Sequence, residues 1–293
     1  MLFRRSYITY LIIVLTLLPP ALSRAESAPV WKVTTPNTHI FIGGTVHLLA
    51  KDDYPLPSAF ETAYQQSQVL VFETDIQQSK SPQFQQALLA KTMYTDGTVI
   101  GDKLAPNTQA ALTQFLASRG LPLNRVERFK PGMLSIMLTV MELQRMGLAN
   151  AGVDEFYSKK ASQDNKPQLF LESIDEQLGF LEQMGKGQED TFILHTLKDI
   201  NQLPTMMTQL KSAWRGGDNQ ALIDVALIPW KNEFPDVYQS LLVKRNNAWM
   251  PRIEQMLTTA EVEYVLVGAL HLVGDDGILT QLRAQGYQVE KLK

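Results

Sequence analysis

The stretch Phe41-Ile42-Gly43-Gly44-Thr45-Val46-His47-Leu48 has a counterpart near the other end of the chain, Leu266-Val267-Gly268-Ala269-Leu270-His271-Leu272. Each begins with an apolar run that is typical of a buried strand and continues into Gly-x-x-His. With four His and 17 Gly in 293 residues, fewer than one such match is expected by chance. The repeat therefore predicts two related strand ends, each followed by a His.

A second pair of matching stretches lies between them. Val71-Phe72-Glu73-Thr74 and Phe170-Leu171-Glu172-Ser173 each end an apolar run with Glu and a hydroxyl residue. The order along the chain is His, Glu, Glu, His. This order predicts two related α/β halves that face one cleft.

The chemistry of these four side chains favours a metal site. Ligand sites of open α/β sheets lie beyond the carboxyl ends of the strands, and a Gly there allows the tight turn that aims a His into the crevice. A Glu at the end of a buried strand is costly unless it is paired or binds a cation. Two imidazoles and two carboxylates suit Mn, Co or Zn, and such an ion activates water with a Glu as general base. The predicted metal ligands and catalytic residues are His47, Glu73, Glu172 and His271, with Gly44 and Gly268 as further site candidates.

Other interpretations stay open at this stage. The two His are equally compatible with hydrogen-bonded loop residues, and the two Glu with ion-paired strand ends. Asp154 either caps the helix that follows Gly152 or reaches the site, and capping is the favoured interpretation. Arg245 fits a solvated helix face or a residue that enters the cleft to bind a substrate carboxylate. His39, inside a strand, and His195, on a polar helix, are predicted bystanders.

Apolar periodicity and turn residues predict a single α/β domain over 26–293 with a helical insertion or cap at about 105–258. Strands are expected at 30–35, 38–43, 69–72, 168–171, 264–267 and 288–292. Helices are expected at 59–67, 82–95, 107–119, 131–148, 153–164, 175–185, 188–200, 203–216, 218–226, 233–258 and 277–285.

The first residues and the composition predict where the protein is located. Residues 1–25 combine two early Arg, an apolar core and a Ser-Arg-Ala end, which is typical of a cleaved secretory signal. We therefore expect an exported protein, periplasmic or extracellular, with no stable membrane span after cleavage. Cleavage removes three Arg and no acidic residue, which changes the formal net charge from −3 to −6. An acidic chain is unsuited to nucleic acid, and the absence of Cys excludes disulfides, thiol catalysis and Cys-based metal sites.

At these motifs the sequence resembles the TraB/GumN family, which includes the animal TIKI proteases. The resemblance covers about Val30 to Leu292. Two departures are Gly132 where the family has an aromatic after Pro, and Ser173 where it has Thr. The matching pieces are Gly43–Leu48, Val71–Thr74, Gly152–Asp154, Leu171–Ser173, Trp214–Asp218, Gly268–Gly274 and Gly286–Val289.

The resemblance implies a fold like that of the erythromycin-esterase and ChaN-like group, with two related halves around one cleft. It also implies a divalent-metal peptidase whose motif residues hold the ion. We therefore expect an exported metal-dependent hydrolase acting on a peptide or small molecule. One alternative is a non-catalytic protein that binds a metal or haem, and another is a metal-free esterase using His and Glu. The oligomeric state is not predicted.

Overall fold

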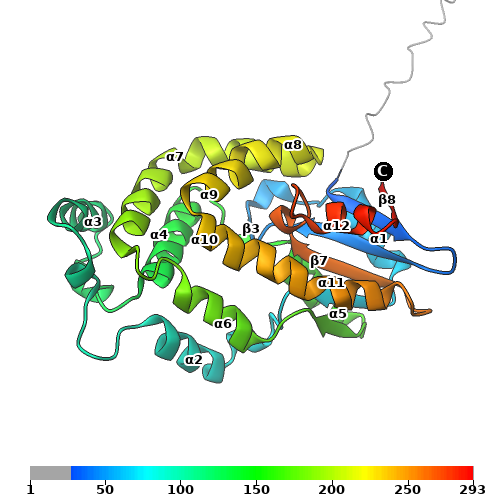
Figure 1. The fold of residues 1–293 in the computed structure, drawn as a ribbon, viewed down its shortest axis with the longest axis horizontal. Helices are drawn as coiled ribbons and strands as arrows, with labels where there is room; N and C mark the ends of the chain where they lie inside the picture. The colour runs from blue at the N-terminus through cyan, green and yellow to red at the C-terminus, as the bar shows by residue number, and fades with distance from the viewer. Residues whose placement is uncertain (1–27, 293) are drawn as a thin grey trace, which may run out of the picture.

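A six-stranded mixed sheet lies at one end of the molecule, and helices form the other end (Figure 1). The computed structural model describes residues 28–292, so the predicted signal segment 1–25 lies outside the described residues. The strand order is β6-β4-β7-β2-β1-β8. The bounds are β1 (Val30–Thr34), β2 (His39–Thr45), β4 (Val69–Phe72), β6 (Gln168–Phe170), β7 (Glu263–Gly268) and β8 (Gln288–Lys291), with a separate pair β3 (Leu48–Leu49) and β5 (Asn150–Ala151).

Strands β2, β7, β4 and β6 run parallel, so their carboxyl ends share one edge of the sheet. The central strands are continuous apolar runs because both of their faces are buried. His47, Glu73, Glu172 and His271 each follow one of these ends by one to three residues. The four motif residues therefore lie at one edge of the sheet. Both Glu-bearing strands lie on the β7 side of the β2–β7 pair, and the two related halves stay a prediction.

Four helices cover the sheet and share its core: α1 (Ser58–Gln66), α5 (Val153–Gln163), α11 (Lys244–Met256) and α12 (Ile278–Ala284). Their apolar faces bury large side chains such as Phe60, Tyr157 and Trp249 against the strands. Trp214, which belongs to the helical end, donates an indole hydrogen bond to the carbonyl oxygen of Gly44, 2.8 Å away. This bond ties the helical end to the strand that carries His47.

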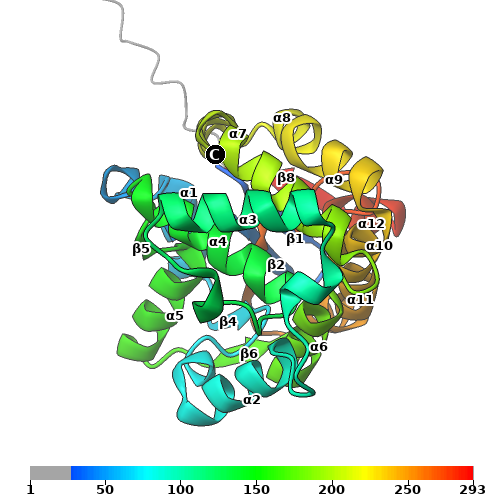
Figure 2. The same cartoon turned by 90° about the vertical axis from the view of Figure 1, so that its left-hand side faces the viewer.

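The helical end has its own smaller core, which includes Leu134 and Leu138 of α4 and Ile193 of α7. Seen from that end, α3 and α4 pass in front of strands β1, β2 and β4 (Figure 2). The predicted helical range 105–258 also contains β6 and α5, which belong to the sheet. The helices are α2 (Pro82–Thr92), α3 (Pro106–Ser118), α4 (Pro131–Arg145), α6 (Ile174–Gln183), α7 (Glu189–Gly216), α8 (Asn219–Leu222), α9 (Ile228–Glu233) and α10 (Pro235–Tyr238).

The predicted helix break near residue 201 is wrong. Helix α7 is 28 residues long and continues without a break through Pro204. Pro lacks a backbone donor and usually ends a helix, but here Ile200 and Leu203 stay buried on the same side of α7. Two π-helical segments connect neighbouring helices without a break: Ile223–Leu227 joins α8 to α9, and Gln239–Val243 joins α10 to α11. Among residues 28–292, no helix combines the length and hydropathy needed to cross a membrane.

Candidate active site

His47 lies just beyond β2, where the chain runs beside the start of α5. Gly152 is the N-cap of α5, and a Cβ on it would lie 2.2 Å from the carbonyl oxygen of Val46 and 2.5 Å from the Cα of His47. Only glycine allows this close approach of two backbones. The amide of Val153 donates a 3.0 Å hydrogen bond to the same Val46 oxygen. The first turn of α5 is thereby fixed against the backbone that carries His47.

Asp154, in that first turn, holds the His47 ring. Its Oδ2 lies 2.9 Å from Nδ1 of His47. Asp154 makes no capping hydrogen bond to α5, so the favoured capping interpretation is wrong. The carboxylate stabilises the charged imidazole and raises the pKa of His47 to about 9. The ring is 67% exposed, and within residues 28–292 no hydrogen bond to its Nε2 is found, so Nε2 is open to a bound molecule.

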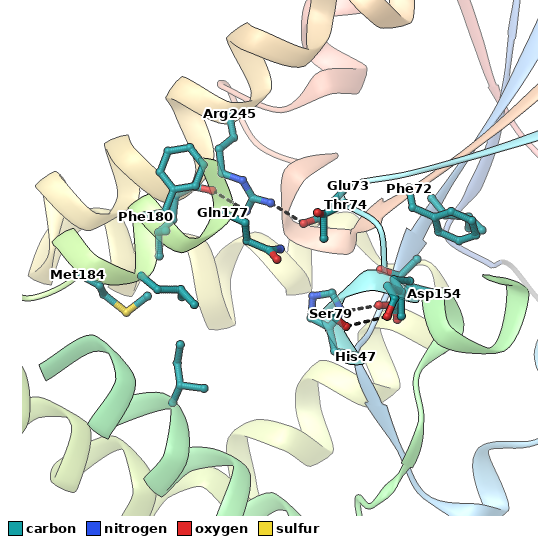
Figure 3. Close-up of a pocket in the computed structure, with 16 residues that line it drawn as sticks. His47, Phe72, Glu73, Thr74, Ser79, Asp154, Gln177, Phe180, Met184 and Arg245 are labelled. Atoms are coloured by element: carbon teal, nitrogen blue, oxygen red, sulfur yellow. Dashed lines mark hydrogen bonds and ion pairs between the residues drawn. The ribbon is translucent and has the colours of Figure 1, made fainter. Parts of the chain in front are cut away.

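Arg245 lies at the start of α11, directly after the π-helical segment 239–243, and enters the cleft (Figure 3). Its Nη2 donates to Glu73 Oε2 at 2.5 Å and to Glu172 Oε1 at 2.8 Å, and its Nε donates to Glu172 Oε2 at 3.0 Å. Its Nη1 donates to His271 Nε2 at 3.1 Å and to the Leu241 carbonyl oxygen at 3.2 Å. A guanidinium has five N–H donors, and these bonds use all five. Arg245 therefore positions its neighbours, and neither the solvated face nor the binding of a substrate carboxylate fits this arrangement.

The groups around Arg245 are buried, and their pKa values follow from that burial. Burial raises the pKa of Glu73, but Arg245 opposes it most strongly and the net result is a pKa of about 2. The Gly268 amide also donates to Glu73 Oε1 at 2.7 Å. Burial raises the pKa of Glu172 in spite of its two bonds to Arg245. Burial lowers the pKa of His271 to about 3, so its ring is neutral, accepts from Arg245 and donates from Nδ1 to Asn246 Oδ1 at 2.7 Å.

This arrangement does not fit the predicted metal centre. Both oxygens of Glu172, one oxygen of Glu73 and the Nε2 of His271 already accept hydrogen bonds from Arg245. The guanidinium supplies the positive charge that an ion would supply to these ligands. No group of three or more His, Asp or Glu suited to holding a metal is found within residues 28–292. A metal ion would require Arg245 to leave this position.

Two cavities share lining residues at this site, and we name each one after a helix that lines it. The α6 chamber has a volume of about 590 Å³ and includes Phe180 of α6; the α7 chamber has about 430 Å³ and includes Leu210 of α7. Figure 3 shows the α6 chamber with Arg245 reaching across toward Glu73. Both chambers share the same centre, which is made of Thr45, His47, Glu73 and Arg245.

Comparisons with known proteins show the family of this chain. A sequence model of the TraB/PrgY/gumN family matches residues 29–291, which is nearly the whole described chain. The chain belongs to the TraB/PrgY/gumN family. Two relatives, each named uncharacterized protein YbaP, come from Escherichia coli strain K12 and from Shigella flexneri. Each is 25% identical over 259 residues, which cover 87% of this chain and 92% of the relative. No solved structure matches the chain.

In this TraB-family chain, not every glycine and histidine that the sequence analysis considered belongs to the site. Gly268 contributes its amide to the site, whereas Gly44 serves packing, since a Cβ on it would lie 3.1 Å from Ala269. His39 lies within β2 as predicted. His195, the other predicted bystander, lies outside both chambers, with its Nδ1 2.9 Å from Glu233 Oε2 and its side chain 28% exposed.

Three further residues of this TraB-family site were missed from the sequence. Asn246 orients the His271 ring, and it follows Arg245 directly in the chain. Thr45 and Thr74 line the α6 chamber, and their buried hydroxyl oxygens have no hydrogen-bond partner within residues 28–292. A buried hydroxyl without a partner is costly, so these two are suited to a bound molecule or water. The available signal was their position inside the motifs, beside Gly44 and Glu73.

Proposed function

We propose that the protein is an exported hydrolase that uses His47 as general base on a peptide or ester carbonyl. The observation that carries this proposal is the His47–Asp154 pair, with Nδ1 held at 2.9 Å and Nε2 open to the cleft. An imidazole oriented through Nδ1 by a carboxylate is the arrangement that lets Nε2 move a proton. The two-halved esterase-like fold implied by the resemblance is part of the same proposal.

In the proposed reaction, Nε2 of neutral His47 takes a proton from water, and the oxygen of that water attacks the carbonyl carbon. The imidazolium then returns the proton to the departing amine or alcohol. Asp154 stabilises the imidazolium between these steps. Thr45 and Thr74 line the same chamber as His47, and their hydroxyls, which have no hydrogen-bond partner within residues 28–292, would donate to the developing oxyanion. Arg245 keeps Glu73 ionised, holds Glu73 and Glu172 in place, and takes no proton itself.

A metal-dependent peptidase is the second proposal. It rests on Glu73, Glu172 and His271, which the family resemblance names as ligands and which all accept hydrogen bonds from Arg245. It requires that substrate or metal displaces the Arg245 guanidinium. In that form the ion would polarise the carbonyl and acidify water.

Purified protein should hydrolyse members of a library of peptides and p-nitrophenyl esters, and it should keep that activity in EDTA. Elemental analysis of the same sample is the matched measurement. Activity that is lost in EDTA and restored by Mn, Co or Zn would select the metal-dependent proposal. Tight binding of a metal ion or haem without turnover of any library member would contradict both and favour a binding protein.

Asp154→Asn should move the pH dependence of kcat/KM to lower pH. Asp154 stabilises imidazolium, so its removal lowers the pKa of His47 from about 9 toward the ordinary value near 6.5. Because neutral His47 is the base, kcat/KM rises with pH through this pKa, and the rising limb should shift down by about two units. The plateau should also fall, since the ring loses its orientation. Glu155→Gln, one residue further on α5, is the control, and an unshifted limb in Asp154→Asn would argue against His47 as base.

A further inference from the structure

Helix α4 carries apolar side chains on two sides, and one of these sides lines the cleft. Leu134 and Leu138 are fully buried in the core of the helical end. Ile136, Val140 and Leu143 follow each other at spacings of four and three residues and are only half-buried. A helix that is apolar on both sides is normally buried on both sides. The apolar side chains on the second side of α4 are therefore only partly packed against other residues.

The second side of α4 divides between the two chambers. Ile136 lines the α6 chamber, where it faces the same space as Phe180, Leu181 and Met184. Val140 and Leu143, one and two turns further along, line the α7 chamber, together with Met207, Leu210 and Trp230. Both volumes fall within the range of small-molecule pockets, which are mostly apolar. The shared centre with His47 lies where the chambers meet.

The charged side chains that line these chambers are already paired with each other, so they offer no free partner to an ionised ligand group. Beyond the shared centre, the charged side chains lining the α7 chamber are Asp53 and Lys211, whose Oδ1 and Nζ lie 2.5 Å apart. The α6 chamber adds Asp154, which is paired with His47. An ionised side chain in either chamber would lose its hydration without gaining a free counter-charge. An uncharged apolar group loses nothing by entering.

We propose that the two chambers bind large apolar groups on the two sides of the bond that is hydrolysed beside His47. The substrate is then a peptide or ester with apolar groups at both positions that flank the carbonyl linkage. This inference rests on the proposed function and adds the substrate class to it. Burial of each group strengthens the interaction with the transition state, and discrimination of about 10- to 100-fold in kcat/KM is expected at each position.

Ile136→Trp and Val140→Trp form a matched pair of tests, because they lie one turn apart on the same side of α4. Full-length wild type should cleave acetyl-Leu-Leu-amide faster than the analogues with Gly at the first or second position, about 10- to 100-fold in kcat/KM. Ile136→Trp fills the α6 chamber and should remove the preference at one position. Val140→Trp fills the α7 chamber and should remove it at the other position. Each variant should lose more kcat/KM on the Leu-Leu substrate than on the analogue with Gly at the affected position.

Calorimetric binding of acetyl-Leu-Leu-amide and acetyl-Gly-Gly-amide separates this inference from the proposed function. Tighter binding of the Leu compound, weakened in both Trp variants, supports the chambers even if nothing is hydrolysed. Hydrolysis with no preference for Leu at either position overturns the inference and leaves the proposed function standing. Identical effects of both variants on both positions also overturn it. If a Trp variant does not fold, Ile136→Ala and Val140→Ala should each shift the preference from Leu toward Phe at one position only.

Discussion

Arg245→Leu is expected to lower the free energy of unfolding by about 3–5 kcal/mol, since it leaves a buried ion-pair network without its cation. The side chains of Arg245, Glu73 and Glu172 are 10%, 12% and 4% exposed, so water cannot replace the lost bonds. His271 loses its Nη1 donor at the same time. The variant therefore carries two buried carboxylates with no charge to balance them.

Urea denaturation of both proteins at pH 7 measures this loss, with the exposed Arg283→Leu of α12 as control. The loss should shrink as the pH falls. In the wild type, the low pKa of Glu73 adds stability that is present above its unfolded value near 4.5 and disappears as the pH falls toward 2. In the variant the same carboxylates should have raised pKa values, and their protonation at low pH removes the cost of burying unpaired charges. A change of less than about 1 kcal/mol at pH 7 would show that Arg245 does not hold the cluster.

His47→Ala is expected to lower kcat/KM by about 10²- to 10⁴-fold, the range of a general base. The free energy of unfolding should change by less than about 1 kcal/mol, because the ring is 67% exposed and lies outside the two cores. This combination separates a catalytic role from a structural one. Steady-state hydrolysis and thermal unfolding of the same preparation measure the two effects.

His39→Ala is the matched control for His47→Ala, since His39 begins β2, the strand that leads to His47, and lies outside both chambers. It should leave kcat/KM within about twofold of the wild type. Full activity in His47→Ala would move the general base to another residue of the cleft. A large loss of stability in that variant would mean that the ring supports the fold, which its exposure argues against.

Much of the fold was predictable because its signals are local. The six strands of the main sheet were expected close to their observed bounds. For the central parallel strands, the signal was a continuous apolar run with turn residues at its ends. The break expected near residue 201 was wrong because burial of Ile200 and Leu203 outweighs the cost of Pro204. Propensity is a weak guide where tertiary packing holds a helix together.

The candidate site was predictable to a lesser degree. The four motif residues were found because each one directly follows a strand. Asp154 and Arg245 were site candidates, but helix capping was favoured for Asp154 and a solvated face stayed open for Arg245, because neither residue type is unusual in those places. Their actual contacts join positions far apart in the chain, and no periodicity encodes such contacts.

The sequence by itself determined which four strand ends carry His or Glu, because parallel strands must bring their carboxyl ends to one edge. Only the tertiary structure decided what those residues bind. The close approach at Gly152 brings Asp154 to His47, and the helix that follows the π-helical segment carries Arg245 between Glu73 and Glu172. The physical reason is that buried carboxylates must be neutralised, and an arginine from a distant helix can do this as well as a metal ion.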